Sequence, residues 1–228
     1  VTCGENYFIF TNNDSAYETA LSLFEKGIAV KIIDIRKKTS SKIVKHAEKL
    51  GINIYWNSTV TNTFGYRKIN SIEIMSLSDD GSNVIGEKIK VSCDCLALSG
   101  GWTPMVHMHT QPGGKLNFRE SDQVFLPKEQ GSEHISVGSC NGDFELDDII
   151  KNTNEKVKSL LNLKETEFEK TYVSCTKELD KRNIWLLPNK ITLGKTKSFI
   201  DFQNDSTAKD IKLALREGFR SIEHVKRY

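Results

Sequence analysis

The chain has 228 residues, of which 38% are hydrophobic and 27% charged, and its formal net charge is +2. This composition suffices for one large or two modest folded domains. Basic and acidic residues are interspersed, which argues against nucleic acid or a membrane surface as a partner. The five cysteines form an odd set without zinc-ligand spacing, so we expect neither a disulfide scaffold nor a metal site, and a reducing, cytoplasmic compartment.

The first 56 residues alternate between strand and helix patterns. Apolar runs at 7–10, 28–35 and 52–56 are typical of buried strands. Segments 16–26 and 40–50 have helical character, and each is followed by a glycine. Two consecutive strand–helix–strand units predict an α/β fold with an open, doubly wound sheet of the Rossmann type.

The pattern changes after residue 58. Runs at 59–64, 68–76 and 87–91 predict a β-meander, and 95–98 predicts a further buried strand. A meander inserted before the last parallel strand is typical of flavoproteins with two dinucleotide domains. Short strand and helix patterns follow at 134–138 and 144–163. We therefore expect a dinucleotide-binding-like domain over 1–163 and a small, mostly helical domain over 164–228.

The turn after the first strand is where a Rossmann fold binds a pyrophosphate. Here it runs from Thr11 to Ala16, contains no glycine and includes Asp14. Two interpretations stay open, a degenerate nucleotide turn and a helix cap on a fold that has lost its ligand. Asp34 ends the second strand and could accept hydrogen bonds from a ribose, with the basic residues at 36–38 favouring a phosphorylated one. The alternative for Asp34 is a solvated strand end.

A second small-residue loop, from Gly138 to Gly142, lies between a predicted strand and a predicted helix. It could contact a dinucleotide that is held mainly by residues elsewhere, or it could be a tight turn. His107 and His109 could project from one side of a strand, but packing within a loop is favoured because no third ligand or base accompanies them. No residue is a good candidate for catalysis.

Several segments resemble one enzyme family. Residues 101–115, beginning Gly-Trp-Thr-Pro, and residues 13–17 are similar to parts of the alpha subunits of heterotetrameric sarcosine oxidases. The most specific similarity is the run 197–211, followed by 216–219 and 223–228. The resemblance covers nearly the whole chain, which suggests an internal piece of a longer protein, as do a first residue that is not methionine and a last segment that looks structured.

The resemblance implies a division of labour between subunits. In that family sarcosine is oxidised at FAD on the beta subunit, the alpha subunit holds NAD, and FMN lies between the two. A folate-binding domain ends the alpha subunit and passes formaldehyde equivalents to tetrahydrofolate, and gamma and delta subunits complete the assembly. The resemblance implies that this chain would contact NAD through Gly138, Ser139, Cys140, Phe144 and Leu146. It would contact the FMN phosphate through Lys226 and Arg227.

One departure separates this chain from related amine and opine dehydrogenase subunits. Those subunits carry a Cys-x-Cys pair of iron–sulfur ligands, where this sequence has Asp201 and Gln203. Because cluster ligation needs thiolates, no iron–sulfur cluster is expected here. Two other functions remain as alternatives, a stand-alone pyridine-nucleotide reductase and a ligand-free structural module that mediates subunit assembly.

Overall fold

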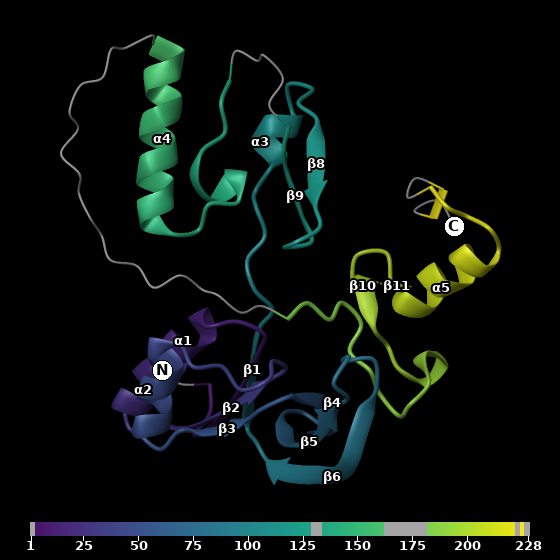
Figure 1. Cartoon of the computed structure of the whole chain (residues 1–228). Helices are drawn as coiled ribbons and strands as arrows, with labels where there is room; N and C mark the ends of the chain where they lie inside the picture. The colour runs from purple at the N-terminus through teal and green to yellow at the C-terminus, as the bar shows by residue number, and fades with distance from the viewer. Residues whose placement is uncertain (1–2, 129–133, 162–181, 222–223, 226–228) are drawn as a thin grey trace.

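The structure is a computed structural model that describes residues 3–128, 134–161, 182–221 and 224–225. Its centre is a four-stranded parallel sheet in the order β3-β2-β1-β7 (Figure 1). The strands are β1 (Asn6–Thr11), β2 (Ala29–Asp34), β3 (Asn53–Tyr55) and β7 (Cys95–Ser99). Helices α1 (Ser15–Glu25) and α2 (Lys42–Lys49) connect the first three strands. The predicted Rossmann-type sheet is therefore confirmed.

One face of the parallel sheet packs against α1 and α2, and an antiparallel meander covers the other face. It consists of β4 (Ser58–Gly65), β5 (Ile69–Leu77) and β6 (Val84–Ser92), as the sequence predicted. Successive side chains of a strand point to opposite faces, so β1 contributes to two cores. Tyr7 and Ile9 pack against α1 and α2, whereas Phe8 packs against the meander. Burial on both faces explains why the parallel strands read as continuous apolar runs.

A separate group of elements follows β7 in the chain (Figure 1). It comprises the short helix α3 (His107–Thr110), the hairpin of β8 (Leu116–Arg119) and β9 (Val124–Pro127), the 3-10 turn η1 (Gly138–Asn141) and helix α4 (Leu146–Leu161). The expected strand at 134–138 is not formed: residues 134–137 are irregular, and Gly138 begins η1. The expected helix at 144–163 is confirmed as α4, none of whose described side chains is buried.

The two histidines near residue 108 lie on α3 rather than on a strand. His107 is exposed, whereas His109 is buried and packs on His134 with ring centroids 5.0 Å apart. His109 Nε2 lies 3.0 Å from the Lys115 carbonyl oxygen, and its Nδ1 lies 3.2 Å from His134 Nε2. Packing within the loop, and not a shared ligand site, is what the geometry shows for His109.

The C-terminal part contains the 3-10 turn η2 (Leu193–Lys195), the short hairpin of β10 (Phe199–Asp201) and β11 (Ser206–Thr207), and helix α5 (Ala208–Arg216). A reciprocal capping box between Thr207 and Asp210 begins α5. The expected boundary at residue 164 lies outside the described residues, so the division into two domains stays a prediction. None of the helices in the described ranges has the length and apolarity that a bilayer crossing needs.

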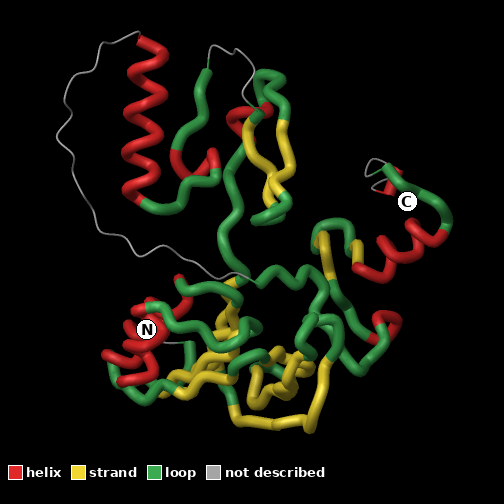
Figure 2. The backbone as a smooth tube through the Cα atoms, in the orientation of Figure 1, coloured by secondary structure: helices red, strands yellow, loops and turns green. Residues whose placement is uncertain are grey.

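Residues 182–189, here named the C-terminal strap, return to the parallel sheet and the meander (Figure 2). The Arg182 guanidinium donates four hydrogen bonds, to Ile35 O (2.8 Å), Asn57 Oδ1 (2.6 Å), Ser78 O (3.2 Å) and Asp79 O (3.0 Å). Gly81 permits this approach, because a Cβ there would lie 2.8 Å from Arg182 Nη2. Asn189 adds a bond of 2.7 Å to the Thr61 carbonyl. The strap is thus fastened to the residue that follows β2, to β4 and to the turns at Asn57 and at Ser78–Asp79.

The first prediction concerns Arg182. Replacing Arg182 by Ala removes all four side-chain bonds, each worth about 1 kcal/mol or more with a charged donor, so the strap should open locally. Hydrogen exchange of the backbone amides of residues 183–189 should accelerate, while exchange in β1 stays unchanged. Lys195→Ala, at an exposed position of η2 outside the strap, is the control. Equal exchange of the strap in both variants would contradict this role.

Candidate functional site

The strand order places a topological switch point between β1 and β7. From β1 the chain proceeds through α1 to β2 on one side, whereas β7 pairs with β1 on the other side. Thr11 and Ser99, the last residues of the two strands, are register partners. Ligands of open α/β sheets bind at the carboxyl ends of the strands at such a point. This edge is therefore the first place to test for a nucleotide site.

The turn between β1 and α1 is closed by its own side chains. Asn13 is 1% exposed, and its Oδ1 accepts a hydrogen bond of 3.0 Å from the Ser15 backbone N–H. Its Nδ2 donates to Asn12 Oδ1 at 2.8 Å and to the Ser99 carbonyl at 3.4 Å. A backbone donor at the helix N-terminus, which a phosphate would need, is thus already engaged by Asn13.

Arg36 joins this turn to the end of β2 through a buried ion-pair network. Its Nη1 lies 2.8 Å from Asp14 Oδ1, and its Nη2 lies 2.8 Å from Asp34 Oδ2. Tyr17 Oη donates to the same Asp34 oxygen at 2.8 Å. Arg36 and Asp34 are 1% and 0% exposed. Asp34 is therefore neither a ribose ligand nor a solvated strand end, because Arg36 and Tyr17 occupy its carboxylate inside the protein.

The charges of this network disfavour an anionic ligand. Burial alone would lower the pKa of Arg36, but the hydrogen bonds and charges of Asp34 and then Asp14 raise it above its ordinary value. Burial, followed by the negative charge of Asp34, raises the pKa of Tyr17 as well. Counted formally, two carboxyl side chains and one guanidinium give the network a charge of −1 beside the first turn of α1. A phosphate there would meet a negative charge.

The other two basic residues of the 36–38 run point elsewhere. Lys37 pairs with Asp79 at 2.9 Å and Lys38 pairs with Glu48 at 2.9 Å, with side chains 64% and 67% exposed. The expectation that residues 36–38 form a cationic site for a phosphorylated ribose is therefore wrong. Arg36 lies inside the protein, and the two lysines make surface ion pairs.

A loop from the end of β7 completes the closure. Gly101 has φ +97°, and a Cβ added there would lie 3.6 Å from Asn12 Oδ1. Trp102 Nε1 donates to Ser15 Oγ at 3.2 Å, which holds the indole beside the first residue of α1. Asn13, the Arg36 network and Trp102 thus occupy the surroundings in which a dinucleotide would place its pyrophosphate. The residues at this turn do not fit that group.

The second predicted loop lies with α4 and the β8–β9 hairpin, away from this edge (Figure 1). Gly138 and Gly142 have φ +70° and +80°, and a Cβ on Gly142 would lie 2.7 Å from Leu126 Cδ2. Cys140 Sγ donates to the Val137 carbonyl at 2.9 Å. Ser139 is exposed.

The structure brings the five residues predicted for NAD into one continuous segment. Gly138, Ser139 and Cys140 form η1, and Phe144 and Leu146 lie before and at the start of α4. Leu146 is 46% exposed. Their contact with NAD stays a prediction. Lys226 and Arg227, predicted for the FMN phosphate, lie outside the described residues.

Asp201 and Gln203 stand where related subunits carry iron–sulfur ligands. Here they belong to the end of β10 and the turn that leads to β11. Asp201 Oδ1 accepts from the Gln203 backbone N–H at 2.8 Å, and its Oδ2 accepts from Asn204 Nδ2 at 2.6 Å. The bonds from Asn204 and Gln203 lower the pKa of the Asp201 carboxyl below its usual value. Within the described ranges, no group of three or more His, Cys, Asp or Glu residues could hold a metal ion.

Comparison with known proteins gives one consistent answer. Residues 195–228 match the family described as the sarcosine oxidase A3 domain. Over its full length the chain is 28% identical, across 235 residues, to sarcosine oxidase subunit alpha of Corynebacterium sp. (strain U-96). It is 29% identical, across 238 residues, to the corresponding subunit of Corynebacterium sp. (strain P-1). The chain is homologous to the sarcosine oxidase alpha subunit. It spans 24% of the length of each of these two alpha subunits.

Among solved structures, thioredoxin reductase of T. acidophilum is similar in fold. The TM-score is 0.53 at 19% identity, and the similarity covers 70% of this chain and 52% of that one. At this level of identity the similarity shows the fold alone. It agrees with the parallel sheet and inserted meander seen here.

Sequence reasoning missed Arg36 and Arg182. The spacing Asp34-x-Arg36 was a usable signal for the first, since an arginine two residues after a strand-end carboxylate can fold back onto it. No local sequence pattern indicated the role of Arg182, because this residue lies 147 residues from the Ile35 carbonyl that it binds.

The second prediction concerns Arg36. Replacing Arg36 by Met leaves the two carboxylates without their buried cation, and breaking such a pair costs about 3–5 kcal/mol. Hydrogen exchange of the amides in α1 and β2 should accelerate accordingly in the full-length protein. The control, Lys38→Met, removes an exposed cation and should leave these rates unchanged. Similar exchange rates in the two variants would contradict a structural role for the network.

The third prediction is a pH dependence carried by Tyr17. Its raised folded-state pKa means that its contribution to stability is present below the unfolded pKa of about 10 and is lost as the pH rises further. The stability advantage of the wild type over Tyr17→Phe, measured by thermal unfolding, should therefore shrink above pH ~10. Tyr66→Phe, which alters a side chain that is 98% exposed, should show no such change. A constant Tyr17→Phe difference across this range would refute the assignment.

Proposed function

We propose that this chain is part of a sarcosine oxidase alpha subunit and that it supports NAD and FMN without carrying the substrate-oxidising site. The whole-length similarity to sarcosine oxidase alpha subunits carries this proposal. The closed turn after β1 adds to it, because this Rossmann-type unit lacks a phosphate cradle of its own. The stand-alone pyridine-nucleotide reductase is disfavoured by the same turn.

The proposed reaction is the oxidative demethylation of sarcosine to glycine, with oxygen and tetrahydrofolate as co-substrates. The assembly would be cytoplasmic, with beta, gamma and delta subunits as partners, FAD on a partner subunit and folate bound outside this chain. The bound cofactors supply the redox chemistry, and the protein positions them. No side chain of this chain is assigned a catalytic role.

Two short segments would make the cofactor contacts. The η1 loop fits the edge of a dinucleotide, because Ser139 is exposed and Gly138, at φ +70°, lets the backbone turn sharply there. Its Gly138, Ser139 and Cys140, with Phe144 and Leu146, would contact NAD. Lys226 and Arg227 would pair with the FMN phosphate, since cations form strong hydrogen bonds to phosphate oxygens.

The fourth prediction separates the two contacts by cofactor content. In the full-length oxidase, Ser139→Phe should lower bound NAD and spare FMN, because the added ring obstructs the loop surface. Lys226→Gln combined with Arg227→Gln should lower bound FMN and spare NAD. Both contents are measured by chromatography after denaturation. Ser121→Phe, at an exposed position of the β8–β9 hairpin, controls for added bulk. Unchanged NAD and FMN in all variants would refute the assigned contacts.

A second candidate, the ligand-free assembly module, is favoured by the surface of α4. Leu146, Val157, Leu160 and Leu161 are 46%, 42%, 57% and 58% exposed, so several large apolar side chains lie uncovered on one helix. If NAD and FMN contents were unaffected in the experiment above, while Leu160→Glu abolished co-purification of the partner subunits, the assembly function would replace the cofactor role.

A further inference from the structure

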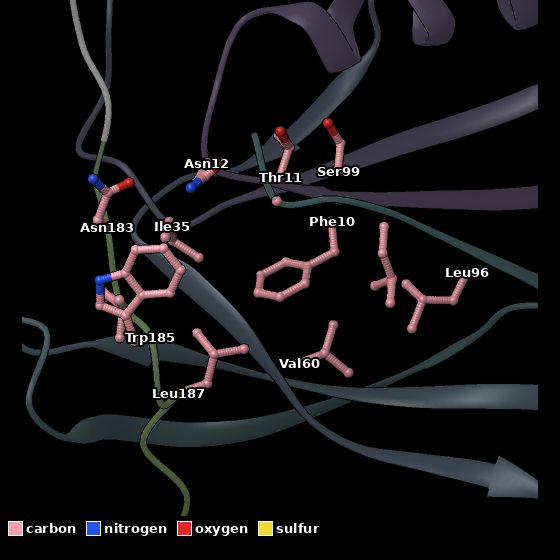
Figure 3. A pocket seen from close by; sticks show the side chains of 13 residues that line it. Phe10, Thr11, Asn12, Ile35, Val60, Leu96, Ser99, Asn183, Trp185 and Leu187 are labelled. Carbon is pink, nitrogen blue, oxygen red and sulfur yellow. The ribbon is translucent and has the colours of Figure 1, made fainter. Parts of the chain in front are cut away.

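A cavity of about 470 Å³ lies at the carboxyl ends of β1 and β7, on the meander side of the sheet (Figure 3). Its volume is within the range of small-molecule sites, roughly 300–1,000 Å³. We propose that this cavity binds a small uncharged molecule that has an aromatic or aliphatic body and one hydrogen-bonding end. The lining includes none of the residues proposed above for NAD or FMN.

The body of the ligand would lie against apolar walls from three parts of the chain. The sheet contributes Phe10 and Leu96, and β4 contributes Val60. The C-terminal strap contributes Trp185 and Leu187 on the opposite side, and Figure 3 shows the Trp185 indole facing the space in front of Phe10. Apolar walls on both sides suit a flat or branched hydrocarbon body, whose burial is the main source of affinity in such pockets.

One end of the cavity is polar but uncharged. Asn12, Ser99 and Asn183 line it there. Asn12 already bonds to Asn13 and to the Arg182 carbonyl, and Asn183 bonds to the Asp122 carbonyl, but each amide keeps a second N–H and a second lone pair for a ligand. All the residues that line the cavity are neutral at pH 7. A charged ligand would lose its hydration without gaining an ion pair, so the lining selects a neutral molecule.

The neighbouring turn restricts the ligand further. The Arg36 network, whose formal charge is −1, and Asn13 occupy the adjacent helix N-terminus, so a phosphate group has no place to bind. The ligand is therefore not a nucleotide that extends along α1. It is a compact molecule that lies within the cavity itself.

The strap makes the cavity a preformed site. Arg182, which immediately precedes the lining residues of the strap, is held by its own hydrogen bonds. Asn183 donates a bond of 3.2 Å to the Asp122 carbonyl. Trp185 Nε1 also donates to Gln123 Oε1. A wall held in place before binding costs less ordering entropy when a ligand enters.

The test titrates the full-length protein with benzamide, a neutral ring with one amide, and follows the ligand signals by NMR. Benzoate, of the same size but charged, is the matched ligand. Benzamide should bind with a dissociation constant on the order of 1 mM, typical of so few atoms. Benzoate should bind at least about tenfold more weakly, because it meets no cation in the lining.

Two variants and one control locate the binding. Val60→Phe fills the cavity, and Trp185→Ala removes a wall at a position that is 76% exposed. Each should weaken benzamide binding at least about tenfold while the melting temperature stays close to that of the wild type. Ile85→Phe introduces the same aromatic side chain on β6, at a position 50% exposed and away from the lining, and should leave binding unchanged.

Several results would overturn the proposal. Benzamide binding that is equal in the wild type and in Trp185→Ala, even if Val60→Phe fails to fold, would exclude this cavity. Equal affinity for benzoate would exclude selection for a neutral ligand. Competition between saturating NAD and benzamide would assign the cavity to the dinucleotide. Loss of NAD or FMN in the Ser139, Lys226 and Arg227 variants without loss of benzamide binding shows that the two proposals stand or fall separately.

Discussion

The buried guanidinium of Arg36 determines what the carboxyl edge of this sheet can do. It lies between Asp14, at the start of α1, and Asp34, at the end of β2. An arginine buried to this degree is costly to desolvate and is stable only with good partners, so the two acids and the arginine form one unit. The unit fixes the relative position of the β1–α1 turn and β2, and it fills the region where other Rossmann-type folds hold a pyrophosphate and ribose.

Closure of that turn does not close the whole edge. The strap crosses it and is fastened by a second arginine, Arg182, whose acceptors are mainly backbone carbonyl oxygens. Backbone acceptors do not depend on the identity of the side chains that carry them. Between the strap and the sheet remains an apolar cavity whose lining is uncharged. The edge thus excludes anions at α1 and keeps an apolar space on the opposite face of the sheet.

The sequence predicted the elements of the sheet and the meander because their signals are local. Strand alternation, helical spacing and terminal glycines are read within about ten residues of each other. The Arg36 network was not predicted, because whether a side chain folds inward or into solvent depends on partners from another element, here Asp14. The packing of His109 was anticipated but the short helix α3 was not, since two histidines separated by one residue are also compatible with a strand. The strap depends on contacts across more than a hundred residues, which no periodicity reveals.

The proposed cofactor role depends on a contrast between the filled turn after β1 and the exposed surface of η1 and α4. The Rossmann-type unit has its phosphate position filled, so it has little capacity left for a dinucleotide along α1. The η1 loop and α4 are different, because Ser139 is exposed and α4 has no buried side chain within the described ranges. A helix with three exposed leucines and one exposed valine gains stability when a further surface covers these side chains. The relatives are about four times as long as this chain, and their additional sequence can provide such a surface. Cofactor contacts at η1 would then form where that surface meets α4.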